Sequence, residues 1–395
     1  MRRLLIATAM TVAALAGLAG LGQVDAAFTG KTSATVRFTA APAFASGSLY
    51  GWGDSAAGQT GAAASGSLTS PTRVGTATTW VRPSAGAAFA CAARTDGTLW
   101  CWGDNSNGQL GLGDTTPRTA GPVQVTGAVT WTAVAAGQKH ACGVRSNGTL
   151  WCWGANASGQ LGLGDTADRT APAQVGTVTT WRTVTSGTAH TCGLRSDGTV
   201  WCWGAGAVGQ VGVGTTTDRT APVKVGSVTT YSAITAGAMH TCATRVDGGV
   251  WCWGDNSAGQ LGQGNTSNRL SPFRVGTAAW RTAATGGRHT CAIGTDGSLW
   301  CWGAGASGQL GLGATTNRTT PVRVGTGTTW RTVTPGAQHT CATDEAGAVW
   351  CFGANALGQL GLGDTTDRTA PAQVPSFTGR PIASGPDSAT TLAIG

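Results

Sequence analysis

Charged side chains are scarce in this 395-residue sequence, in which Asp, Glu, Lys and Arg together make up 11%. Beyond the first 26 residues, 23 basic residues stand against 16 acidic ones, and the basic residues recur singly rather than in runs. Proteins dedicated to nucleic-acid binding concentrate basic residues in a patch or an arm. The small number and the spacing of the charges therefore argue against nucleic acid as a partner.

Long apolar runs are missing after the first segment, so no later stretch is expected to span a membrane. Two arginines precede an apolar run from residue 4 to about residue 21, and small residues follow at 24–26. This is the pattern of a secretory signal peptide. We expect residues 1–26 to be cleaved, residues 27–45 to form a leader segment, and the product to be secreted or associated with the cell envelope. The alternative is a retained membrane anchor, because the run is almost long enough to span.

Helical periodicity is also absent after this segment, and a repeat of about 50 residues takes its place. A Leu-Trp-Cys-Trp-Gly motif or a close variant occurs six times, and a degenerate copy at Leu49–Gly53 makes seven. The six motifs stand at Leu99–Gly103, Leu150–Gly154, Val200–Gly204, Val250–Gly254, Leu299–Gly303 and Val349–Gly353. A period this regular indicates one supersecondary unit repeated in space.

Within one unit the apolar residues alternate, which is typical of short strands. In one of the units we expect strands at 122–125, 131–134, 140–145 and 149–153. Four antiparallel strands per unit, seven times, predict an all-β fold, a seven-bladed β-propeller over residues 46–395. Residues 390–395 match the third strand of a unit and stop where its hairpin turn would follow, and the first copy begins just after such a turn. We predict that these N- and C-terminal strands pair in a shared seventh blade, which would remove exposed sheet edges.

The twelve cysteines form six couples, each ten positions apart, with a Gly-containing turn between the two members. The couples are Cys91/Cys101, Cys142/Cys152, Cys192/Cys202, Cys242/Cys252, Cys291/Cys301 and Cys341/Cys351. A hairpin centred on that turn would place the two cysteines opposite each other, within reach of a disulfide. We predict six cross-strand disulfides. The closing unit lacks both cysteines, with Gly51 at the second position and Thr390 at the first.

The alternative to disulfides is that the cysteines bind zinc, because a histidine stands two residues before a cysteine in five units. Such a site would have at most three ligands per unit and would have to recur five times, and an exported chain favours disulfides. We therefore expect no metal and no cofactor.

The remaining motifs suggest a family. Each unit continues with a Gly-Gln-Leu-Gly-Leu-Gly loop or a variant, as at Gly108–Gly113, then a Pro-x-x-Val and an Ala-Gly-x-x-His-Thr-like strand. Over nearly all of residues 46–395 this strongly resembles the regulator of chromosome condensation repeat family, and the resemblance implies a seven-bladed propeller. The family namesake is a nucleotide-exchange factor for a small GTPase that uses a wedge inserted in the propeller. The spacings here leave no room for such a wedge, so exchange activity is the less favoured function.

Residues that recur in every unit are best explained by packing, whereas a catalytic site needs a unique constellation. We expect the repeated histidines to be interior or turn-bonding residues: His140, His190, His240, His289 and His339. We expect the repeated arginines to satisfy loop carbonyls or Asp side chains rather than to form an anion-binding ring: Arg118, Arg169, Arg219, Arg269, Arg318 and Arg368. The glycine-rich loops lack the Lys-Ser/Thr of a phosphate cradle. The sequence therefore predicts a protein that is not an enzyme.

Function is expected where the units differ, and the residues just before the repeated histidine differ most conspicuously. The candidate partner-binding rim consists of Gln138, Lys139, Thr188, Ala238, Met239, Gly287, Arg288, Ala337, Gln338 and Asp387. The resemblance implies that they lie on one open face, and their mixture of charge and adaptable apolar side chains suits a protein interface. We predict an interaction module that binds a protein through this rim. The alternative is a carbohydrate- or cell-wall-binding propeller, which would expose aromatics at equivalent positions of its blades.

Overall fold

The computed structural model describes residues 46–62, 66–127 and 129–395. Within these ranges the regular structure consists of 28 strands and no helix, and nothing helical there is long and apolar enough to cross a membrane. The all-β prediction is therefore confirmed. The expected signal peptide and leader segment lie outside the described residues and stay predictions.

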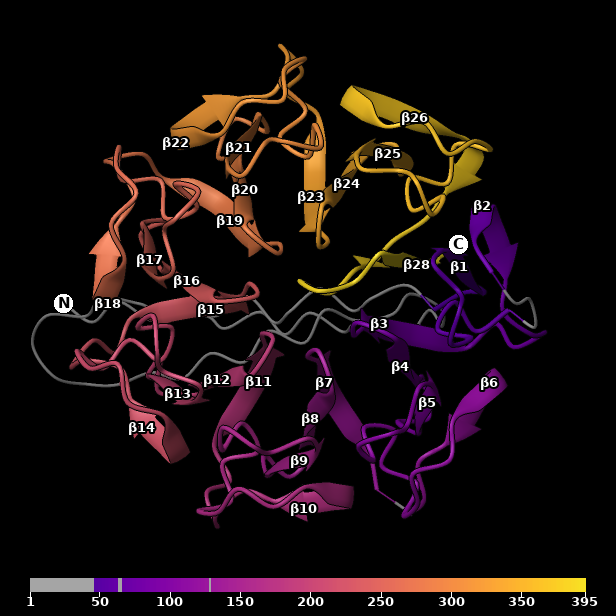
Figure 1. Cartoon of the computed structure of the whole chain (residues 1–395), viewed down its shortest axis with the longest axis vertical. Coiled ribbons are helices and arrows are strands. Elements are labelled where there is room, and N and C mark those ends of the chain that lie inside the picture. Colours follow the sequence, from indigo (N-terminus) through magenta and orange to yellow (C-terminus); the bar gives the residue numbers. More distant parts are fainter. Residues whose placement is uncertain (1–45, 63–65, 128) are drawn as a thin grey trace, which may run out of the picture. The chain divides into compact units, whose positions relative to one another are not determined.

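The strands form seven four-stranded sheets, each with antiparallel neighbours, and each sheet is one blade (Figure 1). Blade 1 consists of β3 (Trp80–Ala85), β4 (Phe89–Arg94), β5 (Leu99–Gly103) and β6 (Arg118–Gln124). Blade 2 consists of β7 (Trp131–Ala136), β8 (His140–Arg145), β9 (Leu150–Gly154) and β10 (Arg169–Gln174). Blade 3 consists of β11 (Trp181–Ser186), β12 (His190–Arg195), β13 (Val200–Gly204) and β14 (Arg219–Lys224).

The remaining blades follow the same plan. Blade 4 consists of β15 (Tyr231–Ala236), β16 (His240–Arg245), β17 (Val250–Gly254) and β18 (Arg269–Arg274). Blade 5 consists of β19 (Trp280–Thr285), β20 (His289–Gly294), β21 (Leu299–Gly303) and β22 (Arg318–Arg323). Blade 6 consists of β23 (Trp330–Pro335), β24 (His339–Asp344), β25 (Ala348–Gly353) and β26 (Arg368–Thr378). Blade 7 consists of β27 (Ile382–Ala383), β28 (Thr390–Ile394), β1 (Leu49–Gly53) and β2 (Leu68–Arg73).

The innermost strands of blades 1 to 6 contact one another in succession, and β27 of blade 7 contacts β3 of blade 1. The remaining step is made by Thr334 Oγ1 of β23, which donates to the carbonyl of Ile382 of β27 at 3.2 Å. The blades therefore close into a ring (Figure 1), and the core is divided among the interfaces between adjacent blades. Trp153 is typical: its side chain is fully buried against Phe89 and Leu99 of blade 1, and its indole nitrogen donates to the carbonyl of Gln109 at 2.9 Å. Each blade thus buries both faces of its sheet, which explains the apolar residues on both sides of each third strand.

The antiparallel plan gives the ring two different ends. The loop face carries the turns between first and second strands and the glycine-rich loops between third and fourth strands. The hairpin face carries the turns between second and third strands and the links from one blade to the next. The turns on the hairpin face contain the expected left-handed glycine, such as Gly148 with φ of +76°.

The predicted pairing of the N- and C-terminal strands is confirmed, because β1 and β28 pair antiparallel with Leu49 opposite Ile394. The predicted alignment of the missing cysteines is wrong by two residues. Gly51 lies opposite Leu392, whereas Thr390 lies opposite Gly53. The turn before β28 is longer than in the other blades, so the structural equivalents shift along the chain.

The predicted grouping of strands within a unit is also corrected. Residues 118–124 belong to blade 1, because Val123 lies opposite Cys101 of the third strand that precedes it. The strand also begins at Arg118, four residues before the expected start. A fourth strand pairs with the strand just before it in the chain, so each of blades 1 to 6 begins at the Trp or Tyr of its innermost strand.

Candidate functional site

All twelve cysteines are disulfide-bonded in the predicted couples, and none is free. The bonds are Cys91–Cys101, Cys142–Cys152, Cys192–Cys202, Cys242–Cys252, Cys291–Cys301 and Cys341–Cys351. In every pair the two Cα atoms are 4.1 Å apart and directly opposite in the register, as in blade 2. The sulfur atoms thus crosslink neighbouring strands of one hairpin. In the described part of the chain, no group of three or more His, Cys, Asp or Glu side chains is arranged to hold a metal.

The repeated histidines are buried and join each blade to the next. His140 Nε2 lies 2.9 Å from Thr191 Oγ1, and Thr191 Oγ1 in turn donates to the carbonyl of Gln160 at 2.8 Å. Because that hydroxyl has one proton, His140 must donate from Nε2, which leaves Nδ1 as the unprotonated nitrogen. The other four histidines make the same contact, with Thr241, Thr290, Thr340 and Thr391.

Burial keeps these histidines neutral. It lowers the pKa of His140, His240 and His339 to about 4. It lowers the pKa of His190 and His289 to about 3, with a further contribution from neighbouring histidines. A buried imidazole that already donates to a structural threonine is not placed for proton transfer to a substrate. The histidines are therefore interior residues, as expected, and each also links its blade to the next through a threonine.

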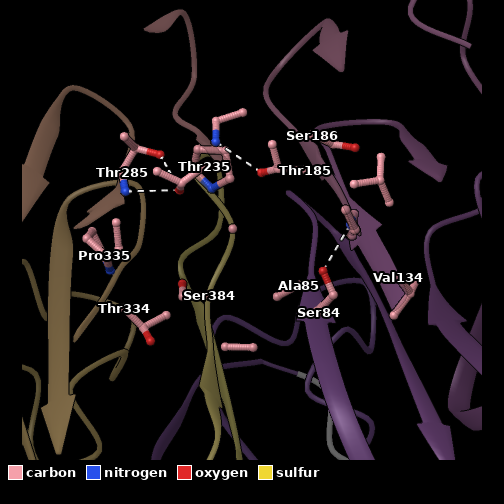
Figure 2. A pocket seen from close by; sticks show the side chains of 18 of the residues that line it. Ser84, Ala85, Val134, Thr185, Ser186, Thr235, Thr285, Thr334, Pro335 and Ser384 are labelled. Atoms are coloured by element: carbon pink, nitrogen blue, oxygen red, sulfur yellow. Dashed lines mark hydrogen bonds between the residues drawn. The ribbon is translucent and has the colours of Figure 1, made fainter. Parts of the chain in front are cut away.

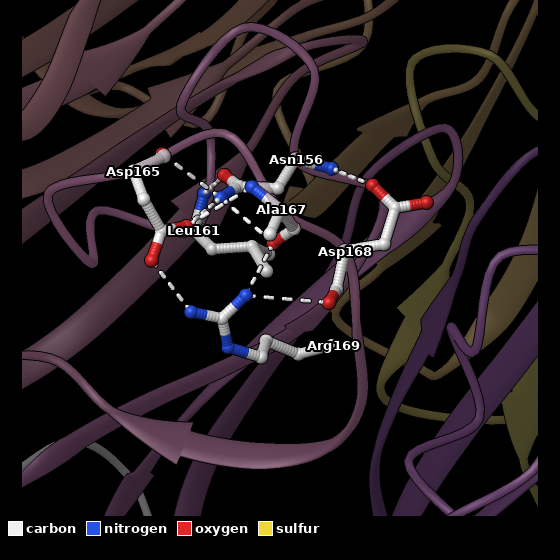
Figure 3. A network of polar contacts seen from close by, with 6 residues as sticks. All are labelled: Asn156, Leu161, Asp165, Ala167, Asp168 and Arg169. Atoms are coloured by element: carbon white, nitrogen blue, oxygen red, sulfur yellow. Dashed lines mark hydrogen bonds and ion pairs between the residues drawn. The ribbon is translucent and has the colours of Figure 1, made fainter.

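The repeated arginine on the loop face takes part in a polar network within its own loop (Figure 3). Arg169 Nη2 lies 2.6 Å from Asp165 Oδ2, and its Nη1 donates to the carbonyl of Ala167 at 2.7 Å. Asn156 Nδ2 donates to the carbonyls of Asp165 and Ala167, and the backbone nitrogen of Asn156 donates to Asp168. The Ala167 backbone bond and Arg169 together lower the pKa of Asp165. The arginine therefore satisfies carbonyls and an Asp, as the sequence predicted.

The same ion pair recurs in two other blades, as Arg118–Asp114 and Arg368–Asp364, each at 2.6 Å. Blades 3, 4 and 5 carry Thr215, Asn265 and Ala314 at the position of the acid. There Arg219 donates to Thr215 and Arg269 to Gln263. The acid is therefore dispensable for the loop, and the ion pair is a local feature of some blades.

A cavity of about 250 Å³ lies at the centre of the ring, lined by residues of all seven innermost strands (Figure 2). Its hydroxyl groups face the next blade: Ser84 Oγ accepts from the backbone nitrogen of Ala136 at 2.9 Å, and Thr185 Oγ1 accepts from that of Ala236 at 3.0 Å. The described residues that line the cavity include no Asp, Glu, His, Lys or Arg. The centre therefore lacks a group for acid–base chemistry.

The predicted rim separates into two sets. In the inner set, Thr188 N donates to the carbonyl of Ala238 at 3.1 Å and Ala238 N to that of Gly287 at 3.3 Å, whereas Ala337 N donates to the carbonyl of Ser388 at 3.0 Å. Thr188 Oγ1 also donates to Asp387 Oδ2 at 2.7 Å, across the ring from blade 3 to blade 7. Burial raises the pKa of Asp387, and the bond from Thr188 opposes that rise. These residues are half-buried or buried and bind one another.

The outer set faces solvent. Lys139, Met239, Arg288 and Gln338 are exposed, and Met239 keeps 47% of its surface accessible. Arg288 Nη2 donates to Ser257 Oγ of the neighbouring loop at 2.7 Å, which holds its side chain against the loop face. Gln138 is intermediate in exposure. The structure therefore leaves four exposed side chains of the predicted rim available to a partner.

The repeats match known family models along most of the chain. The RCC1-like domain matches residues 20–283, and the regulator of chromosome condensation (RCC1) repeat matches residues 296–343 and 346–384, with a second model of this repeat at 281–309. The chain belongs to the RCC1-like repeat family. Among curated proteins, none matches it significantly.

Solved structures of RCC1-like proteins share the fold. Human WBSCR16 is 21% identical with a TM-score of 0.79, and the match covers 88% of this chain and 98% of that one. Yeast RCC1 (Prp20), solved with bound Kap60, is 19% identical with a TM-score of 0.79, and the match covers 93% and 96%. Prp20p from Saccharomyces cerevisiae, described with its binding to Gsp1p and histones, is 19% identical with a TM-score of 0.77, and the match covers 88% and 91%.

Sequence reasoning missed one recurring contact of this RCC1-like ring. In blades 1 to 4 the last residue of the second strand is an arginine whose guanidinium lies over two aromatic rings on the hairpin face. These residues are Arg94, Arg145, Arg195 and Arg245, with distances to the nearer ring centroid of 3.9, 3.5, 3.8 and 3.8 Å. The signal was present as a Cys-x-x-Arg spacing in four units, which becomes Cys-x-x-Gly at Gly294 and Cys-x-x-Asp at Asp344.

Proposed function

We propose that this protein is an exported, non-enzymatic propeller that binds a protein through the loop face, with Lys139, Met239, Arg288 and Gln338 as the contact residues. The observation that carries the proposal is the contrast between residues that the blades share and residues that differ among them. Residues shared by the blades are used by the fold, whereas these four project to solvent from equivalent places and differ from blade to blade.

The chemistry of the four side chains supports a protein partner. An exposed methionine adapts to the shape of an apolar pocket, and arginine is enriched in interfaces because its planar guanidinium makes several hydrogen bonds. Met239 is among the most exposed large apolar side chains of the described residues. The solved RCC1-like structures also include a complex with a protein, Kap60, and one described with binding to Gsp1p and histones.

The disulfides support export. Six hairpin crosslinks without a free thiol suit an oxidising compartment, since cytosolic thiols are kept reduced. The same inference agrees with the signal-peptide pattern of residues 1–26, which would direct the chain to the cell exterior or envelope.

The experiment is a pull-down from the native exterior, followed by an affinity measurement with the partner that it yields. The triple variant Lys139→Ala, Met239→Ala and Arg288→Ala is expected to weaken binding by roughly tenfold or more, because a few central side chains dominate most interfaces. The matched control carries Lys224→Gln, Val246→Ala and Arg73→Gln, which change two basic residues and one apolar residue on the hairpin face. Unchanged affinity in the first variant together with lost affinity in the control would place the interface on the hairpin face and contradict the proposal.

A further inference from the structure

Blade 5 lacks the guanidinium that covers the aromatic rings of four other blades. In blade 3, Arg195 Cζ lies 4.6 Å from the centroid of the Trp181 ring and 3.8 Å from that of Trp201. Blades 1, 2 and 4 show the same stacking. Blade 5 has Gly294 at the corresponding place, the last residue of β20 and the partner of Trp280 in the register.

A hollow of about 310 Å³ lies where that arginine side chain would be. Gly294, Trp280, Trp300, Asp296 and Thr277 are among the residues that line it. It is on the hairpin face, at the turn between β20 and β21 and the link that joins blade 4 to blade 5.

The aromatic frame around the hollow keeps the geometry that it has where an arginine is present. The Trp280 and Trp300 rings are 5.8 Å apart at 79°, and the equivalent Trp80 and Trp100 rings, which Arg94 covers, are 6.1 Å apart at 78°. Trp300 Nε1 donates to Ser298 Oγ at 2.8 Å, just as Trp100 Nε1 donates to Thr98 Oγ1 at 2.9 Å. The rings are therefore held in place without the cation, and a ligand would not have to order them.

Compared with blade 3, the hollow of blade 5 has one cation fewer beside its carboxylate. In blade 3, Asp197 interacts with both Arg195 and Lys224, so two cations accompany one carboxylate. In blade 5, the cation that acts on Asp296 is Arg323, the equivalent of Lys224. A guanidinium in the hollow would restore the charge pattern that blade 3 has on its own.

We propose that the blade 5 hollow binds the guanidinium group of an arginine side chain presented by another protein or peptide, between Trp280, Trp300 and Asp296. A guanidinium is favoured over a sugar ring because four equivalent sites of the same fold already hold this group. The site is on the face opposite the loop-face residues proposed above, so this inference goes beyond the proposed function and does not depend on it.

The test needs no partner. The probe is N-acetyl-arginine amide, and the control is N-acetyl-citrulline amide, which has nearly the same shape without the charge. Binding is followed by the NMR signals of the tryptophan indole N–H groups, assigned with Trp280→Phe and Trp300→Phe. We expect saturable shifts of the Trp280 and Trp300 signals with the arginine probe and none with the citrulline control.

Three variants sharpen the test. Gly294→Arg supplies the missing side chain and should abolish the response. Asp296→Asn keeps an acceptor for the turn, as Asn147 does for Thr149 in blade 2, but removes the charge, and should weaken binding by about 2- to 5-fold. Arg245→Gly opens an equivalent hollow in blade 4, so the Trp251 signal should begin to respond to the probe.

Several results would overturn the proposal. Equal shifts with citrulline, no shift in the wild-type protein, or an undiminished response in Gly294→Arg would each do so. A response to a neutral disaccharide in place of the arginine probe would assign the hollow to carbohydrate. The Arg245→Gly variant keeps the test informative if Gly294→Arg does not fold, because failure to create a second responding site would also contradict the proposal.

Discussion

Blades 1 to 6 and blade 7 have the same four-stranded sheet but are held together differently. Each of the first six is one continuous segment whose central hairpin is crosslinked by a disulfide between residues ten positions apart. Blade 7 joins two distant segments without any covalent link: β28 pairs with β1, and Ser48 and Gly395 exchange backbone hydrogen bonds of 3.0 Å. The same sheet thus forms either around a local covalent crosslink or by pairing of segments far apart in the chain, and closing the longer loop costs more conformational entropy.

Blade 7 has other support in place of the disulfide. The ring of Phe377, at the end of the long β26, makes edge contacts with Tyr50 and Trp52 at centroid distances of 5.1 and 5.6 Å. The side chain of Thr390 also donates to the backbone carbonyl of Asp54 at 2.7 Å. Aromatic packing and backbone hydrogen bonds therefore act where the crosslink is absent.

Removing the closing strand should have the largest effect. Deletion of Thr390–Gly395 removes β28 from between β1 and β27 and exposes two sheet edges. We expect the truncated protein to aggregate or to lose its cooperative thermal transition, measured by size-exclusion chromatography and circular dichroism. A monomeric truncated protein with an unchanged melting temperature would show that blade 7 does not close the ring.

Removing one disulfide should cost less. The variant Cys142→Ala with Cys152→Ala opens a loop of about eleven residues, and we expect the free energy of unfolding to fall by about 2–3 kcal/mol. Denaturant titration measures this change, and non-reducing peptide mapping of the wild-type protein verifies the six pairs. Free thiols in the protein purified without reductant, or bonds between different blades, would contradict the pairing.

Adding a seventh disulfide should destabilise the ring. Gly51 and Leu392 are opposite each other, but a Cβ atom at Gly51 would lie 2.2 Å from the carbonyl oxygen of Thr60. The pair Gly51→Cys with Leu392→Cys should therefore lower the free energy of unfolding by roughly 1–3 kcal/mol, the usual range for overpacking, in denaturant titrations without reductant, which leave the six native disulfides intact. The single variant Leu392→Cys separates the loss of the leucine from the backbone clash. A double variant as stable as Leu392→Cys alone would remove this explanation for the missing cysteines.

The histidines offer the finest comparison, because blade 1 has Phe89 and blade 7 has Thr390 where the other five have histidine. The unfolded chain binds protons at these residues below about pH 6.5, whereas burial lowers the pKa of His190 in the folded protein to about 3. Stability should therefore fall as the pH drops from about 6.5 toward 4, by up to about 1.4 kcal/mol per pH unit for each histidine.

The variant His190→Phe places the residue of blade 1 in blade 3. In denaturant titrations between pH 6.5 and 4, the free energy of unfolding of this variant should depend less on pH, by the contribution of one histidine. The variant keeps the bond from Thr241 to the carbonyl of Gln210. An unchanged slope would mean that the pKa of His190 is not lowered in the folded state.

The fold could be predicted because its landmarks are large and regular. Tryptophans and cysteines recur at a constant spacing, and the distance between paired cysteines specifies the hairpin register directly. The error at Thr390 arose where those landmarks are missing, since neither a cysteine nor a histidine marks the register of β28. Strand grouping was shifted for a related reason: a repeat has no intrinsic first residue, and hydrogen bonding alone decides which strand completes a blade.

The candidate site was less predictable than the fold. Variability before the repeated histidine identified the segment but not the direction of its side chains. In each turn one residue faces the axis, where Thr188 reaches Asp387, and the next residue faces solvent, as Met239 does. The hollow at Gly294 needed the register too, because only the pairing of β19 with β20 brings that position beside Trp280.

The pairing of β1 with β28 has a consequence for how the protein is made. Asp54 and Thr390 are separated by 336 residues, so at about 5–20 residues per second the first strand waits roughly 20–70 seconds for its partner to be synthesised. Each hairpin, by contrast, is complete ten residues after its first cysteine. Blades 1 to 6 are available to fold in turn as the chain lengthens, whereas β1 can pair early with β2 but its other edge stays unpaired until β28 is made. A newly made chain is therefore an open arc of blades until β28 is synthesised. During this interval its exposed sheet edge is most prone to pair with other chains.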